Sequence, residues 1–166
     1  MNPSVNFFLI KKFSRLFLLF PLFFLFSCEK SSWEYNYVSN NKNNNFSTLV
    51  YKKQGCFELE FLNLNGKIIC YVNLLDFKIK RPSPVPINII SNGSVKKSFA
   101  VLREGSKRLC LDEEDKNIII GSLEKSLPLS IEIEDYHEDI DPQFFPKNYK
   151  KFLETDSLSK KVISFF

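Results

Sequence analysis

The side chains able to do chemistry in this sequence are one histidine, a run of acidic residues and four cysteines. His137 lies within the acidic stretch 132–141, EIEDYHEDID, which lacks the ligand spacing of an EF-hand calcium loop. Alternation with apolar residues explains Glu132 and Glu134 as the solvated face of a strand. A Ser-His-Asp triad needs no fixed spacing, but no G-x-S-x-G, S-x-x-K, zinc-type Cys/His or phosphate-binding glycine motif is present. We therefore predict no catalytic, cofactor-binding or metal-binding residue and interpret the protein as a non-enzyme.

The charge balance argues against a nucleic-acid partner. The chain carries 23 basic and 19 acidic side chains. Three of the basic ones, Lys11, Lys12 and Arg15, precede residue 28, which leaves 20 basic against 19 acidic residues in the remainder. A nucleic-acid-binding domain needs a basic excess or a basic stripe. We expect no nucleic-acid binding.

The N-terminus has the pattern of a secretory signal peptide. A basic segment is followed by the unbroken apolar run 16–26, LFLLFPLFFLF. A membrane-spanning helix needs about 20 apolar residues, so this run is short, and Pro21 lies inside it. Basic segment, short apolar run and small residue before the cut predict a signal peptide over residues 1–27; an uncleaved signal anchor or a buried core helix is the alternative.

The end of this run, Leu25-Phe26-Ser27-Cys28, resembles the lipobox of bacterial lipoprotein precursors, in the looser form of spirochaetal lipoproteins. The resemblance implies cleavage between Ser27 and Cys28 and lipidation of Cys28 with a diacylglycerol thioether and an N-linked acyl chain such as palmitate. More than one acyl chain is needed for stable attachment. The expected location is the bacterial cell envelope, on the outer membrane, the surface or the periplasmic face. An ordinary signal-peptidase cut is the alternative, which bulky Leu25 fits poorly.

A polar segment follows, and we predict a lipidated N-terminus and tether over residues 28–47. Its NNKNNN core has no apolar periodicity, which is typical of disordered chain. The aromatic patch 33–37, WEYNY, is the exception, and is interpreted as an edge strand or an aromatic anchor at the membrane interface, with a binding motif as a third alternative.

The clearest folded unit is a hairpin within residues 56–77, CFELEFLNLNGKIICYVNLLDF. Asn65-Gly66 is a strong two-residue turn signal, because both positions tolerate positive φ. This turn pairs Phe57 with Leu74 and Phe61 with Cys70 on an apolar face, and Glu60 with Tyr71 on a polar face.

The same register constrains the cysteines of the predicted domain, Cys56, Cys70 and Cys110. In this register the Cα atoms of Cys56 and Cys70 lie too far apart for a disulfide. Two alternatives remain: a bond from either one to Cys110 in an oxidising compartment, or structural thiols, with Cys70 buried.

The remaining sequence predicts further short strands. The proline-rich segment 81–86 is expected to be an edge crossover. Ile87 to Ile90 and Val95 to Arg103 flank a second Asn-Gly at 92–93, where a tight register gives no clean apolar face. A third hairpin around Gly105-Ser106 fits better, with Val101 opposite Cys110. Residues 112–115 are expected to form an acidic turn, and Leu127 to Ile133 a strand.

These elements predict a mainly β fold: an antiparallel β-sandwich of Ig-like architecture with about seven or eight strands. The sandwich covers residues 48–141, and a short helical addition covers residues 142–166, with a terminal strand as the competing interpretation. A small β-barrel is the alternative fold. The expected function is protein binding or envelope assembly; a carrier of a small apolar ligand and a cryptic hydrolase are the alternatives.

Overall fold

The computed structural model describes residues 32–38, 46–103 and 105–163, with side chains described as far as Glu154. The predicted signal peptide, the cleavage site at Ser27 and Cys28, and the NNKNNN segment lie outside these ranges. Among the described helices, none has the length and apolar character needed to cross a membrane.

The described residues form nine antiparallel strands and two helices. The strands are β1 (Trp33–Val38), β2 (Phe46–Tyr51), β3 (Phe57–Leu64), β4 (Lys67–Leu74), β5 (Val85–Ser91), β6 (Ser94–Leu102), β7 (Arg108–Cys110), β8 (Leu129–Ile133) and β9 (Tyr136–Ile140). The helices are α3 (Glu113–Glu124) and α4 (Phe145–Ile163). The strand order in space is β1-β2-β3-β4-β7-β6-β5-β8-β9.

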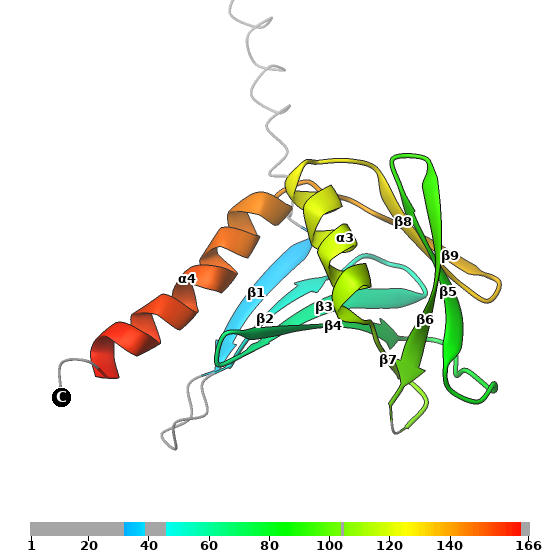
Figure 1. Ribbon diagram of the computed structural model, residues 1–166, viewed down its shortest axis with the longest axis horizontal. Coiled ribbons are helices and arrows are strands. Elements are labelled where there is room, and N and C mark those ends of the chain that lie inside the picture. Colours follow the sequence, from blue (N-terminus) through cyan, green and yellow to red (C-terminus); the bar gives the residue numbers. More distant parts are fainter. Residues whose placement is uncertain (1–31, 39–45, 104, 164–166) are drawn as a thin grey trace, which may run out of the picture. The chain divides into compact units, whose positions relative to one another are not determined.

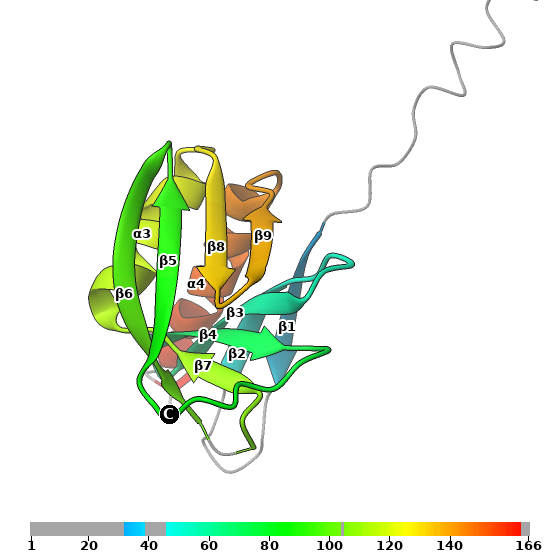
Figure 2. The same ribbon diagram turned by 90° about the vertical axis from the view of Figure 1, so that its right-hand side faces the viewer.

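The sheet bends at β6, which belongs to both of its halves. Residues Val85 to Ser91 of β5 pair with β6 from Ala100 back to Ser94, whereas β7 pairs with β6 only at Val101 and Leu102. Figures 1 and 2 show the two halves running in crossed directions, with both helices on the concave side. The strand order ends at β1 and β9, so the sheet is open. The strands do not close into the small barrel that was the alternative fold.

The core fills the concave side. Side chains of α3 and α4, among them Ile119, Leu123, Phe145 and Phe152, are fully buried against the inner faces of both halves. Trp33 packs edge-on to Phe145, with ring centroids 4.7 Å apart. This packing explains why an apolar stripe recurs on alternate residues of nearly every strand.

Two aromatic side chains tie the β1–β2 edge to the chain that leaves β9. The indole Nε1 of Trp33 donates to the carbonyl oxygen of Asp141 at 2.8 Å. The hydroxyl of Tyr51 donates to the carbonyl of Asp139 at 3.3 Å and accepts from the amide of Asp141 at 3.1 Å. The aromatic patch 33–37 is thus an edge strand with a buried anchor, and residues 33–38 and 46–47 of the predicted tether belong to the sheet.

The β3–β4 hairpin confirms its predicted register pair by pair, including Phe57 with Leu74 and Phe61 with Cys70. Asn65 and Gly66 have φ of 53° and 90°, as a two-residue turn of this kind requires. The predicted pairing of Val101 with Cys110 across the third hairpin is also confirmed.

The second Asn-Gly forms a hairpin that, as predicted, has no clean apolar face. Asn92 and Gly93 form a tight two-residue turn in which Ser91 pairs with Ser94. The pairing gives no uniformly apolar face because the inward side of β6 carries Lys96 and Ser98, whose polar groups meet a buried carboxylate from α3.

The acidic turn predicted at residues 112–115 was wrong, because these residues begin helix α3. The Asp112 side chain caps the helix by accepting a hydrogen bond from the amide of Asp115 at 2.7 Å. Acidic residues in a first turn are favoured by the helix dipole, and α3 carries three of them there.

The fold class is confirmed as mainly β and antiparallel, sandwich-like, with a C-terminal helix. The nine strands exceed the predicted seven or eight because β1 and β9 extend the two edges. The C-terminal tail is helical as far as Ile163, rather than a strand, within the described residues.

Candidate protein-binding surface

Three large apolar side chains stand exposed in a row on the outer face of β6. Val95 is 57%, Phe99 62% and Val101 49% exposed. Phe99 lies four positions after Val95 and two before Val101, so all three side chains lie on one side of the sheet. Lys96, Ser98 and Ala100 face inward. We call Val95, Phe99 and Val101 the β6 stripe.

The stripe continues onto β5 and has one charge in its middle. Exposed Pro86 pairs with Phe99, and half-buried Ile90 pairs with Val95. Lys97 lies between Val95 and Phe99 on the same face and is exposed. The outer face of the hairpin is therefore an apolar patch with a central cation, whereas single exposed apolar residues scattered on a surface need no explanation.

A buried polar cluster on the inner face fixes the orientation of β6. Asp115 of α3 is fully buried. Its carboxylate lies 2.8 Å from Nζ of Lys96 and accepts a 2.5 Å hydrogen bond from the hydroxyl of Ser98. Partial burial lowers the pKa of Lys96, but its hydrogen bonds to Asp115 and Glu114 outweigh that effect and the pKa is raised. With Lys96 held inward, the residues of the β6 stripe must point outward.

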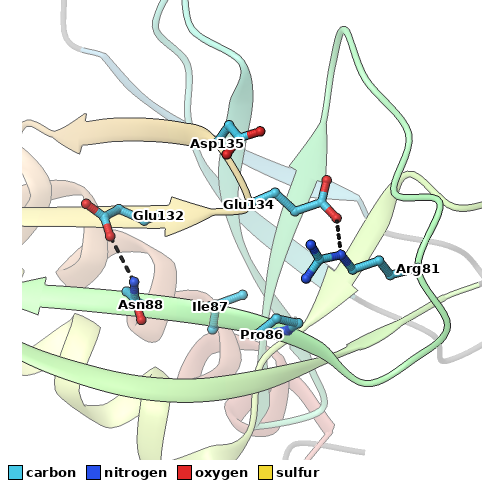
Figure 3. Close-up of a pocket in the computed structure, with 7 residues that line it drawn as sticks. All are labelled: Arg81, Pro86, Ile87, Asn88, Glu132, Glu134 and Asp135. Atoms are coloured by element: carbon cyan, nitrogen blue, oxygen red, sulfur yellow. Dashed lines mark hydrogen bonds and ion pairs between the residues drawn. The ribbon is translucent and has the colours of Figure 1, made fainter.

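A polar hollow of about 360 Å³ borders this patch on the β5 side. Figure 3 shows its lining, in which the Asn88 amide donates to Glu132 at 2.9 Å and Arg81 pairs with Glu134 at 3.5 Å. The lining is Arg81, Pro86, Ile87, Asn88, Glu132, Glu134 and Asp135. Because the lining carries three carboxylates and one guanidinium, the hollow presents negative charge next to the apolar patch.

His137 of β9 lies opposite Glu132 of β8, on the same outer face as the polar hollow. Its Nε2 lies 3.0 Å from Asp139 and its Nδ1 3.3 Å from Glu132. The hydrogen bond to Asp139 raises the pKa of His137 most, and Glu132 adds to the effect. Hydrogen bonds from Asn88 and then His137 lower the pKa of Glu132. The recorded partners of the imidazole within the described ranges are carboxylates, so the arrangement holds a surface ion pair and not a base beside a hydroxyl or thiol.

The described residues contain no group of three or more His, Cys, Asp or Glu side chains placed to hold a metal ion. The acidic stretch divides between opposite faces of the β8–β9 hairpin: Glu132 and Asp139 face outward, whereas Glu138 is buried and accepts from the Cys56 amide at 3.3 Å. Its carboxylates therefore do not converge on one point.

The structure describes the three cysteines of the domain as free thiols. Cys70 is buried on the inner face of β4, and burial raises the pKa of its thiol well above the ordinary value. Cys110 is half-buried on β7, on the opposite face from buried Leu109 and Leu111. Cys70 and Cys110 thus lie on different sides of the sheet.

The β6 stripe was missed from the sequence, although its signal is visible. Val95, Phe99 and Val101 alternate with polar and small residues, but the pattern alone does not say which set faces the core. Searches against family models, curated proteins and solved structures find no match for this chain. The function therefore has to be inferred from the structure of the domain itself.

Proposed function

We propose that this protein is a lipid-anchored component of a bacterial cell envelope whose β domain is non-catalytic and binds another protein through the β6 stripe. The observation that carries the binding role is the exposure of Val95, Phe99 and Val101 on one face of one strand. Aromatic and aliphatic side chains grouped in this way are typical of the centre of a protein interface.

The stripe can supply part of the free energy of a protein contact. Fully burying a valine or phenylalanine side chain contributes roughly 1.5–3 kcal/mol, and about half of each of these side chains is still exposed. Covering all three would therefore contribute about 3–4 kcal/mol before the costs of association. A partner would add contacts to Pro86 and to the polar rim around it.

The packing of the concave side favours protein binding over the carrier function. A carrier of an apolar ligand needs an internal cavity of several hundred cubic ångströms. In this domain the space inside the bent sheet is occupied by side chains of both helices, including fully buried Ile119, Leu123 and Phe152.

The lipid anchor rests on the resemblance of Leu25-Phe26-Ser27-Cys28 to a lipobox. Growth with labelled palmitate is expected to tag the protein, and Cys28→Ala is expected to abolish the tag and release the protein from the detergent phase. Palmitate labelling that survives Cys28→Ala would contradict the anchor.

Site-specific photo-cross-linking in intact envelopes tests the binding role. A photoreactive phenylalanine analogue at position 99 is expected to give a discrete cross-linked product. The matched control carries the same analogue at Leu64, which is 41% exposed at the end of β3. Equal cross-linking from both positions, or none from position 99, would contradict the assignment of the β6 stripe.

A further inference from the structure

Strand β6 has an unoccupied side along most of its length. Residues Ser94 to Ala100 pair with β5 on one side, and the other side is joined by β7 only at Val101 and Leu102. Figure 2 shows β6 as the outermost strand of its half of the sheet. Seven residues of strand, about 23 Å at 3.3 Å per residue, are therefore open to an additional strand.

The register identifies the backbone groups on this open edge. The two-residue turn makes Ser91 and Ser94 a hydrogen-bonded pair, and such pairs alternate along an antiparallel ladder. The backbone groups of Val95, Lys97 and Phe99 therefore point away from β5. Pro86, which has no N–H to donate, lies opposite Phe99, in agreement with this assignment. No backbone partner of these three residues is recorded on the open side within the described chain.

We propose that an extended segment of the partner adds to β6 as an antiparallel strand, with a carboxylate side chain opposite Lys97 and apolar side chains opposite Val95 and Phe99. This inference rests on the proposed function and specifies its chemistry. Main-chain hydrogen bonds to the edge would supply affinity, and alternate side chains over the β6 stripe would supply specificity.

The charge of the partner follows from the two neighbouring lysines. Lys96 faces inward and is neutralised by Asp115 and Glu114, at 2.8 Å and 3.0 Å. Lys97 faces outward, is exposed and has no recorded carboxylate partner among the described residues. Opposite charges directly across two strands are stabilising and like charges are destabilising, so a carboxylate is the favoured cross-strand neighbour of Lys97.

A second copy of this chain fits the edge poorly. In the symmetric pairing centred on Lys97, two lysines lie directly opposite each other, which is destabilising. Centring the pair on Ser98 avoids this clash but sets Val95 of one copy against Val101 of the other, where β7 already occupies the edge. An edge lysine is also a common device against self-association, so Lys97 opposes a second copy while it favours an acidic strand.

The test uses a defined peptide and the full-length chain in mild detergent. The peptide is seven residues long and blocked at both ends, with threonine at the odd positions and Ile, Glu and Val at the second, fourth and sixth. Amide NMR signals of Ser94 to Ala100 are expected to shift on titration. Replacing the peptide's glutamate by lysine is expected to weaken binding at least about fivefold, and Lys97→Glu is expected to reverse this preference.

Backbone methylation of the peptide separates strand addition from side-chain contact. N-methyl groups at the Ile, Glu and Val positions block the amides that would face β6, and are expected to weaken binding about tenfold or more. The same groups on the third and fifth residues face away and are expected to change binding less than about twofold. Equal effects from both sets would overturn strand addition while leaving the β6 stripe as a binding surface.

The two proposals fail in distinguishable ways. If no peptide binds but position 99 still cross-links in envelopes, the strand-addition inference is overturned and the proposed function stands. If position 99 gives no cross-linked product, the proposed function is overturned, whatever the peptides do.

Discussion

Breaking the buried ion pair between β6 and α3 should cost different amounts depending on which partner is removed. Asp115 is fully buried and its carboxylate is held by Lys96 and Ser98. The Lys96 side chain remains 27% exposed and also reaches Glu114 at 3.0 Å. Lys96→Met leaves a carboxylate in the core with one hydroxyl donor, whereas Asp115→Leu leaves an ammonium that is itself buried but retains the Glu114 carboxylate as a partner.

The expected free energies of unfolding follow from this asymmetry. Lys96→Met should destabilise the domain by about 3–5 kcal/mol, the usual cost of an uncompensated buried charge. Asp115→Leu should cost about 1–2 kcal/mol, because the remaining ammonium keeps the Glu114 carboxylate as a partner. Replacing a buried pair by apolar side chains is often nearly neutral relative to the intact pair. The double variant should therefore cost no more than Asp115→Leu alone.

Urea unfolding measured by tryptophan fluorescence can test these values, because the sequence has one tryptophan and Trp33 is buried in the core. In a thermal scan, Lys96→Met should lower Tm by roughly 10–15 °C for a domain of this size. The reasoning is refuted if Lys96→Met costs less than Asp115→Leu, or if the two free energies simply add in the double variant.

Three further predictions concern other parts of the domain. A Cβ at Gly55 would overlap the buried Glu138 carboxylate; Gly55→Ala should therefore displace that side chain and cost about 1–2 kcal/mol in urea unfolding. Iodoacetamide should modify Cys110 well before Cys70 in the native protein, since Cys70 is buried and its thiol pKa is raised; equal rates in the native protein and in urea would contradict this burial. Because the folded-state pKa of His137 is raised, its contribution to stability is present below about pH 6.5 and lost as the pH rises through the raised value. His137→Gln should therefore destabilise the protein more at roughly pH 5.5 than at roughly pH 8.5, and an NMR titration of the imidazole checks the direction of the shift.

Local patterns predicted those elements whose partners are close in sequence. Asn65-Gly66 and the clean alternation beside it specify β3–β4, because turn geometry and burial agree on one register. Helix α3 was missed because three consecutive β-branched residues, 118–120, weaken its helical signal, although the acidic start at Asp112 is a capping pattern.

Which face of β6 is exposed depends on a contact between β6 and helix α3, and no pattern of neighbouring residues predicts that contact. Lys96 and Ser98 face inward only because Asp115 reaches them from a helix that begins more than ten residues later. Without that carboxylate, either alternate set of β6 residues is a plausible core face. The sequence therefore located the hairpin region of β6 without identifying the side of it that is exposed.

The attachment of Trp33 has a mechanical consequence. A chain anchored upstream transmits tension into the domain at the first residue of β1, an edge strand that would otherwise peel from β2 one pair at a time. The first pair to be loaded is Trp33 with Tyr51, and both side chains are also hydrogen-bonded to the segment that follows β9. Force arriving there is shared between the two edges of the sheet, so the domain should resist pulling from its N-terminus better than an ordinary edge strand would allow.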